Sequence, residues 1–337
     1  MVTRNDVARL AGVSPATVSY VVNNGPRPVS PETRAKVIKV IEETGYQPSA
    51  VARNLRMQRT CTIGLILPDI QNPYFSEVVR GIEWVAFEKD YTVLLCHSGY
   101  DLERELQYVD ILQMQRVAGV IWIPATANFE PYEKLVNYGV PTVVLDRHIP
   151  DQEFPAIVAD NFRGGYLASE HLIQLGHQRI GAIARPVELS HSQDRVQGYL
   201  QALLDYGLPV DRELIAPGGY RLENGLKAFN KLISLGKPPT AIFAYNDIMA
   251  MGALRAAHQR GLKVPGDFSI VGFDDIPEAS FTCPSLTTVS QEKFTMGQKG
   301  MELLLGYIEG DETIPHPYPL LEVKLIVRES TGEAPVD

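Results

Sequence analysis

The chain has 337 residues, of which 45% are hydrophobic and 21% charged, and its formal net charge is −9. A chain of this length exceeds one ordinary core, and these proportions are usual for a soluble globular protein. No apolar run approaches the roughly 20 residues of a membrane span, and the polar N-terminus has no signal core, so we expect a cytoplasmic protein. The three cysteines form no C-x-x-C pair, so we expect neither a metal site nor a cofactor.

Charge is distributed unevenly along the chain. Residues 1–59 contain nine Lys and Arg against four Asp and Glu, a net charge of +5, and the remainder has a net charge of −14. A basic segment attached to an acidic body indicates contact with a polyanion. Chance variation in surface charge is the alternative explanation.

Start and stop signals for short helices fill the basic segment. Thr3 can cap a first helix through its hydroxyl, and Gly12 ends that helix. Ser14 followed by Pro15 begins a second helix over residues 15–23, because proline at the first helical position loses no needed hydrogen bond. Valines recur at helical spacing in this second helix, so we expect them to face inward.

A third helix begins at Ser30, again followed by proline, and ends at Gly45. The spacing of Ala8, Gly12 and Val18 is typical of a helix-turn-helix, in which a small residue lets the helices cross closely and glycine permits the turn. Any tight helical pair could show this spacing. Together with the basic charge it predicts a DNA-binding bundle whose second helix enters the major groove.

The outward face of the second helix is polar. Its hydroxyls and amide suit phosphate contacts, whereas Pro15 and Ala16 are poor hydrogen-bonding groups, although Ala16 could meet a thymine methyl. Tyr20 is the strongest candidate for a base-edge contact, and the alternative is a surface aromatic packed on the third helix. The expected outward residues are Pro15, Ala16, Thr17, Ser19, Tyr20 and Asn23.

A second basic segment follows the bundle at residues 48–60. Residues 50–57 could form about two helical turns, a length that is marginal in water, so we expect them to order when paired with a copy of themselves on DNA. Leu55 lies between Arg53 and Arg56, which suits a minor-groove wedge flanked by phosphate contacts. A plain linker is the alternative.

From Thr62 the pattern changes to eight short apolar runs, from TIGLIL to FSIVGF, that alternate with helical stretches. The alternation predicts parallel sheets covered on both faces, and its restart near Asp160 predicts two α/β lobes. Open α/β sheets bind ligands beyond the carboxyl ends of their strands. The candidate ligand residues at these ends are Asp69, Asn72, Tyr74, Phe75, Asp146, Arg147, Asp160, Asn246 and Asp274.

Carboxylates, amides, an arginine and aromatic rings at strand ends predict a sugar-like site, because they bond vicinal hydroxyls and cover C–H surfaces. Asp146, Asp160 and Asn246 could instead cap the turns or helices that follow them. Arg147 and Asp274 favour ligand contact, because a charge placed directly after a buried strand needs a partner. His191 could contact the ligand or be solvated.

The chain closely resembles the lactose-repressor (LacI/GalR) family of bacterial transcription regulators. The matching segments include DVARLAGVSPATVSYVVN, YQPSAVARNLR, IGLILPDIQNPYFSEVVRGIE, VPTVVLDR, AIFAYNDIMAMGAL and VPGDFSIVGFDD, and the resemblance covers nearly the whole chain. It implies a helix-turn-helix domain at 1–47, a hinge segment at 48–60 and an effector-binding and dimerisation domain at 61–337. This last domain would have two lobes like those of periplasmic binding proteins, at about 61–160 with 291–320 and at about 161–290 with 321–330.

The resemblance also implies partners and residue roles. It implies a homodimer, or a dimer of dimers, on near-palindromic double-stranded DNA. Positions matching Pro15, Ala16 and Tyr20 would read bases, and the position matching Leu55 would wedge into the minor groove. Arg195 and Tyr220 match positions that face the effector. The remaining expected DNA contacts are Thr3, Ser14, Thr17, Ser19, Asn23, Arg27, Ser49, Ala50, Arg53 and Arg56.

We therefore expect a DNA-binding transcription regulator of the repressor type, controlled by a sugar or sugar derivative. A purine or another non-sugar effector is the alternative. A sugar-modifying or nucleotide-dependent enzyme is disfavoured, because the chain has no G-x-G-x-x-G, G-x-x-x-x-G-K-[ST], H-E-x-x-H or G-x-S-x-G motif. A secreted solute-binding protein would share the lobes but would not need the basic bundle.

Overall fold

The computed structural model describes residues 2–22, 27–46, 60–147, 154–184, 190–311 and 320–335, with the backbone alone at 190–192. The chain divides into two compact units, Met1–Thr60 and Cys61–Asp337. No helix in these described ranges is long and apolar enough to cross a membrane. Residues 48–59 of the predicted hinge, and Asn23 in the predicted second helix, lie outside the described residues.

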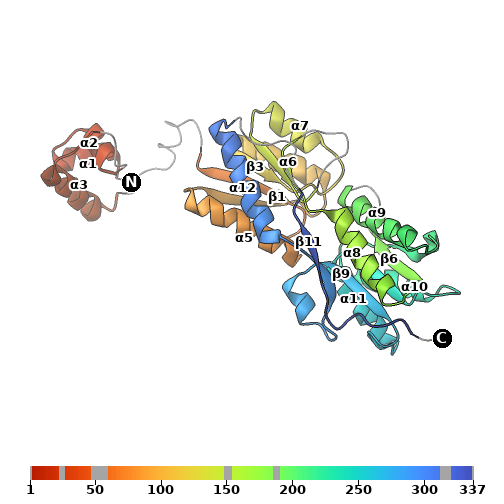
Figure 1. Cartoon of the computed structure of the whole chain (residues 1–337). Coiled ribbons are helices and arrows are strands. Elements are labelled where there is room, and N and C mark those ends of the chain that lie inside the picture. The colour runs from red at the N-terminus through yellow and green to blue at the C-terminus, as the bar shows by residue number, and fades with distance from the viewer. Residues whose placement is uncertain are drawn as a thin grey trace. The chain divides into compact units, whose positions relative to one another are not determined.

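The described residues of the first unit form a bundle of three helices, drawn in red in Figure 1. Its core is made by Val7, Val18 and Val37, one from each helix and each no more than 1% exposed. Thr3 caps the first helix, as the sequence predicts, and forms a capping box with Asp6. The helices are α1 (Arg4–Ala11), α2 (Pro15–Val22) and α3 (Pro31–Thr44).

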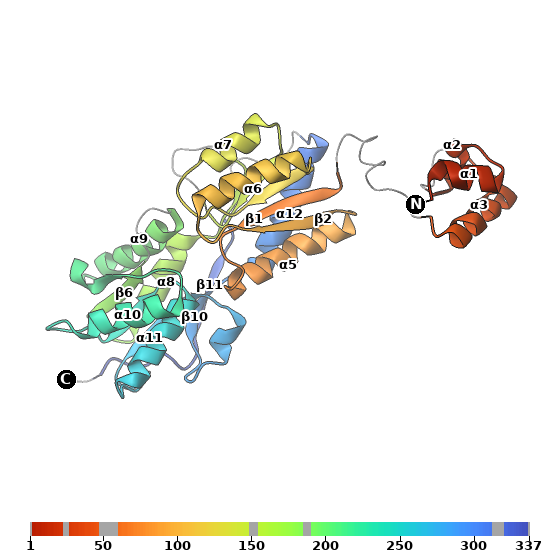
Figure 2. The same cartoon turned by 180° about the vertical axis from the view of Figure 1, so that it is seen from behind.

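A parallel five-stranded sheet forms the core of one lobe of the second unit. Helices α5 and α12 pack on one face of the sheet, and α6 and α7 cover the other (Figures 1 and 2). In sheet order the strands are β2 (Thr92–His97), β1 (Thr62–Leu67), β3 (Gly119–Trp122), β4 (Thr142–Leu145) and β5 (Ala156–Ile157). The helices are α5 (Pro73–Glu88), α6 (Leu102–Met114), α7 (Glu130–Asn137) and α12 (Lys293–Glu309).

The second lobe contains a six-stranded sheet, parallel except for its edge strand β11, which pairs antiparallel with β10. In sheet order the strands are β11 (Val323–Ile326), β10 (Thr287–Gln291), β9 (Ser269–Asp274), β8 (Ala241–Ala244), β6 (Ile180–Ala184) and β7 (Ile215–Pro217). The helices are α8 (Asn161–Gln174), α9 (Ser190–Asp205), α10 (Leu222–Ile233) and α11 (Asp247–Gln259), with 3-10 turns η1 (Arg212–Leu214) and η2 (Pro277–Ser280). This confirms the two-sheet α/β architecture expected from the alternation.

In the described residues, the chain passes between the lobes at three places. It leaves the first sheet after β5 and enters α8, and it returns from β10 to α12 through Glu292. The third passage lies at Leu321, which forms an isolated parallel bridge with Ala159 beside the first passage. The three passages place the carboxyl ends of both sheets around a common space.

Two glycines let α8 and α9 cross at close range. A Cβ on Gly165 would collide with the carbonyl oxygen of Arg195, and a Cβ on Gly198 would collide with that of Phe162. Neither position tolerates a side chain, so the close crossing fixes the backbone of α9 at Arg195. The Arg195 side chain extends from there into the space between the lobes.

Candidate functional site

Side chains from both lobes converge on one small cavity at the carboxyl ends of the strands. Its volume is about 30 Å³, room for little more than one water molecule. Its walls combine polar and aromatic side chains. The lining residues are Asn72, Tyr74, Phe75, Tyr100, Asp146, Arg147, Arg195, Tyr220, Tyr245, Asn246 and Asp274.

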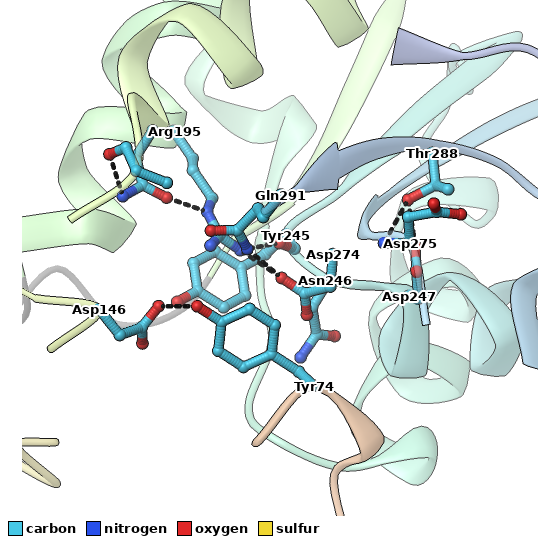
Figure 3. A network of polar contacts seen from close by, with 12 residues as sticks. Tyr74, Asp146, Arg195, Tyr245, Asn246, Asp247, Asp274, Asp275, Thr288 and Gln291 are labelled. Atoms are coloured by element: carbon cyan, nitrogen blue, oxygen red, sulfur yellow. Dashed lines mark hydrogen bonds and ion pairs between the residues drawn. The ribbon is translucent and has the colours of Figure 1, made fainter. Parts of the chain in front are cut away.

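In the first lobe, Asp146 receives a hydrogen bond from Tyr74. The phenol oxygen lies 2.5 Å from Asp146 Oδ1 (Figure 3). Asn72 holds this tyrosine at the start of α5, because its side chain accepts from the Tyr74 backbone N–H at 3.0 Å. Burial, followed by the charge of Asp146, raises the pKa of Tyr74 well above its usual value, so the phenol stays a donor.

Arg147 is the most unusual side chain in the cavity. It is 3% exposed, and its Nε and Nη1 have no hydrogen-bond partner among the described residues. Its closest carboxylate contact is Nε to Asp146 Oδ2 at 3.5 Å. Leaving buried donors unsatisfied costs free energy, so these atoms mark where an acceptor on a ligand would be stabilised.

Arg195 of the second lobe is fixed from several sides. Its Nε donates to Asn161 Oδ1 and its Nη1 to the carbonyl of Tyr245, each at 2.7 Å. Its guanidinium carbon lies 3.6 Å from the centroid of the Phe273 ring. The cation is therefore held in one orientation before any ligand arrives.

Asp274 lies at the end of β9 and faces this cation. Its Oδ1 accepts from Gln291 Nε2 at 2.7 Å and lies 3.5 Å from Arg195 Nη1 (Figure 3). Burial raises the pKa of Asp274 to about 7, against the opposing charge of Arg195 and with the added repulsion of Asp146. This carboxyl therefore changes charge near neutral pH.

Further hydrogen bonds hold the turn after β9, which contains Asp274 and Asp275, in place. Lys293, the first residue of α12, donates to the carbonyl oxygens of Asp274 and Asp275 at 2.5 and 2.8 Å. Thr288 donates to Asp247 at 2.5 Å (Figure 3), and Arg328 bonds Asp275 at 2.6 Å. Gln291 and Lys293 thus connect Asp274 by hydrogen bonds to the passage between the lobes.

Backbone strain concentrates at the cavity. Among the described residues, six that are not glycine have a positive φ, and three of these line the cavity: Tyr100 at +64°, Asp146 at +69° and Asp274 at +113°. Such conformations persist where the surroundings hold them, and they gather at functional sites.

Nine of the predicted effector residues line the cavity. They are Asn72, Tyr74, Phe75, Asp146, Arg147, Arg195, Tyr220, Asn246 and Asp274. Asn246 also has its alternative role, because its side chain caps α11 by accepting from Met249 N at 2.9 Å. Residues 148–153, which follow Asp146 and Arg147, lie outside the described residues.

Two predicted effector residues do not line the cavity and have local roles instead. Asp69 accepts from the backbone of Gln71 at 2.8 Å, and Asp160 caps α8 by accepting from Arg163 N at 2.8 Å. Effector contact by these two residues stays a prediction, because a carboxylate after a strand can also serve a turn or a helix start. The side chain of His191 lies outside the described residues.

Sequence reasoning missed Tyr100 and Tyr245, both of which line the cavity. Tyr245 directly follows β8, so the strand-end rule could have found it. Tyr100 stacks on Tyr220 of the other lobe, with ring centroids 3.5 Å apart. A contact between two distant turns leaves no signal in the sequence.

In the helical bundle, α2 begins at a capped, exposed end. Ser14 Oγ accepts from Thr17 N at 3.1 Å and lies 2.9 Å from Thr17 Oγ1. Pro15 and Ala16 are exposed, and Tyr20 is half-buried. Ser19 is half-buried, and Thr3 and Arg27 are exposed. The predicted contacts at Asn23, Ser49, Ala50, Arg53, Leu55 and Arg56 lie outside the described residues.

Known families match both units. The model of bacterial regulatory proteins of the lacI family matches residues 3–49, and a periplasmic binding protein-like domain matches residues 169–331. The HTH-type transcriptional repressor PurR of Actinobacillus pleuropneumoniae serotype 3 is 38% identical over 98% of each chain.

Solved structures match over almost the full length. The Lac repressor dimer bound to operator and the anti-inducer ONPF has a TM-score of 0.86 and 31% identity, covering 98% of this chain and 99% of that one. A complex of the transcriptional regulator CelR with cellobiose has a TM-score of 0.76 and 32% identity, covering 98% and 100%. The chain therefore belongs to the LacI family of DNA-binding transcriptional repressors.

Proposed function

We propose that this repressor changes its operator affinity when an uncharged, polyhydroxylated molecule, a sugar or sugar derivative, binds in the cavity between the lobes. Arg147 is the observation on which the proposal rests. Its buried guanidinium lines the cavity with unsatisfied donors, and sugar hydroxyls would accept from them. The cellobiose complex of a relative with 32% identity supports the same chemistry.

The charges of the cavity favour an uncharged ligand. Its lining contains two guanidinium groups, Arg147 and Arg195, and two carboxyl groups, Asp146 and Asp274. An anionic ligand would satisfy Arg147 but would be repelled by the carboxylate of Asp146, and also by Asp274 when that group is ionised. A hydroxyl both donates and accepts, so it suits the arginine and the carboxylates together.

Flat rings in the wall support a ligand with an apolar face. Phe75, Tyr220 and Tyr245 supply aromatic surface that can cover the C–H face of a sugar. The same rings would stack on a planar base, so a purine or another planar effector is the second candidate. A comparison of sugars with purines separates the two.

On the DNA side, α2 would enter the major groove, with Pro15, Ala16 and Tyr20 toward the bases and Thr17 and Ser19 toward phosphates. The exposure of its first turn supports this orientation. Leu55 would act as a minor-groove wedge, and the protein would work in the cytoplasm as a regulator without enzymatic activity.

The chain would bind a near-palindromic operator as a homodimer, or as a dimer of dimers, and an exposed apolar face of the first lobe supports self-association. Trp84 and Phe87 of α5 are 55% and 78% exposed, Leu94 and Leu95 of β2 are 39% and 42% exposed, and Met114 of α6 is 68% exposed. β2 is an edge strand of its sheet. Exposed apolar side chains along a sheet edge mark an association surface. The relative crystallised as a dimer on operator DNA supports this arrangement.

The small cavity bears on the mechanism of control. A volume of about 30 Å³ is far below the roughly 300–1,000 Å³ of ordinary ligand sites. A sugar must therefore separate side chains or lobes when it binds. Because Asp274 is bonded to Gln291 and Lys293 at the passage between lobes, this rearrangement would reach α12. Typical couplings of about 1–3 kcal/mol would change operator affinity roughly 5- to 150-fold.

Thermal denaturation of the full chain with glucose, ribose, cellobiose, adenosine and hypoxanthine tests the effector class. A ligand at about 100 times its Kd stabilises the fold by about 2.7 kcal/mol, which is readily measured. We expect a sugar to raise the melting temperature of the wild type but not that of Arg147→Ala. A response to the purines alone would replace the sugar by the second candidate.

A further inference from the structure

A pair of stacked tyrosine rings, one from each lobe, forms part of the wall of the cavity. Tyr100 follows β2 in the first lobe, and Tyr220 precedes α10 in the second. Their ring centroids lie 3.5 Å apart with an angle of 30° between the planes, and both residues line the cavity. The contact therefore joins the lobes where a ligand would have to lie.

The backbone at Tyr100 is held in a conformation that tyrosine rarely adopts. Gly99 and Tyr100 have φ angles of +68° and +64°, so two consecutive residues are left-handed. Gly99 adopts this conformation freely, but a side chain makes it costly at Tyr100. The turn bears this cost while it places the Tyr100 ring against Tyr220.

A ligand cannot share the present cavity with this ring pair. The free volume of about 30 Å³ does not admit a sugar ring, so the two rings must separate for one to enter. The polar groups of Arg147 and Asp274 would then meet the hydroxyls. A tyrosine ring would cover the opposite, C–H face of the sugar.

We propose that Tyr100 contacts the effector directly and, together with Tyr220, selects a pyranose with one flat C–H face. This inference rests on the proposed function and deepens it. In the free protein the rings close on each other, and in the complex the sugar replaces one ring as the stacking partner of the other. Sugars without a flat apolar face would gain less from the exchange.

The test uses two substitutions at Tyr100 and one control. Tyr100→Phe keeps the ring, whereas Tyr100→Gly removes it and also relieves the left-handed backbone, so impaired binding cannot come from added strain. Asp90→Gly is the matched control, because Asp90 has a φ of +59° on an exposed turn outside the cavity lining. Calorimetric titration with cellobiose, glucose and ribose measures the affinities of the full chain.

We expect cellobiose or glucose to bind more tightly than ribose, and Tyr100→Phe and Asp90→Gly to bind like the wild type. Tyr100→Gly should weaken binding about tenfold, in line with the contribution of one aromatic contact. Equal affinity of Tyr100→Gly and the wild type for the bound sugar would overturn the proposal, as would a preference for ribose.

A second measurement tests the ring pair without a ligand. The melting temperatures of Tyr100→Gly, Tyr220→Ala and the double variant should be non-additive, because each single change already removes the stack. Additive shifts would show that the rings do not act as a pair and would contradict the closure. A wild type that binds none of the three sugars would refute the sugar proposal and the selection, while the melting series would still decide whether the pair exists.

Discussion

Asp274→Asn is predicted to alter the pH dependence of stability in a defined direction. Burial raises the pKa of Asp274 from 3.8 to about 7. Below about pH 4 the carboxyl is protonated in the folded and unfolded chain, and above about pH 7 it is ionised in both. Between these values the unfolded chain releases the proton that the folded chain keeps. The folded state therefore loses stability as the pH rises from about 4 to 7.

The magnitude follows from the size of the shift. A pKa raised from 3.8 to about 7 is a change of about 3 units, or about 4 kcal/mol at 1.36 kcal/mol per unit. Asparagine keeps an oxygen that can accept from Gln291 but cannot ionise. Burial, and next the charge of Asp274, also raises the pKa of the neighbouring Asp247. Removing that charge adds a contribution of the same sign.

Urea unfolding of wild type and Asp274→Asn at several pH values between 5 and 8 measures this effect. The free energy of unfolding of the variant relative to the wild type should increase by about 2.7 kcal/mol between pH 5 and 7, at 1.36 kcal/mol per pH unit, and level off above pH 7. The attraction between Arg195 and the ionised carboxylate is already part of the pKa of Asp274, so losing this pair adds no separate pH dependence. If the difference in free energy of unfolding between the variant and the wild type stays constant with pH, Asp274 is not a buried carboxyl that titrates near neutral pH.

The remaining predictions concern packing, ligand response and DNA recognition. Gly198→Ala should lower the free energy of unfolding by about 1–3 kcal/mol, because the new Cβ meets the carbonyl oxygen of Phe162. Gly236→Ala is the control and should change stability little, because no atom lies within 4 Å of its new Cβ. Equal melting temperatures of the two variants would contradict the close crossing of α8 and α9. Arg147→Ala should abolish the ligand response and retain operator binding in anisotropy titrations, and an unchanged response would remove Arg147 from the site. Tyr20→Ala should weaken specific binding by about 1–3 kcal/mol while non-specific DNA binding persists, and equal loss for all DNA sequences would exclude base reading.

The sequence predicted the parts of the fold that depend on local signals. Caps at Thr3, Ser14 and Ser30 begin all three helices of the bundle. Eight apolar runs mark strands β1 to β6, β8 and β9. The strands β7, β10 and β11 are short or carry polar residues, such as TTVSQ in β10, so their pairing is set by the sheet around them.

Local signals also explain how much of the cavity could be predicted. The strand-end rule placed Arg147 and Asp274 correctly at the cavity, but it could not tell a capping carboxylate such as Asp160 from a lining one. Arg195 was expected from the resemblance alone, since its position depends on the close crossing of α8 and α9. Tyr100 depends on a left-handed turn and on a partner in the other lobe.

The most direct test of the central claim is the affinity of the full chain for its operator with and without ligand. An operator selected from a randomised duplex library, labelled for fluorescence anisotropy, would be titrated in the absence and presence of the sugar that stabilises the protein. Our account predicts a near-palindromic operator, an affinity that changes roughly 5- to 150-fold with the sugar, and no such change in Arg147→Ala. An operator affinity that stays the same while the sugar is bound would contradict it.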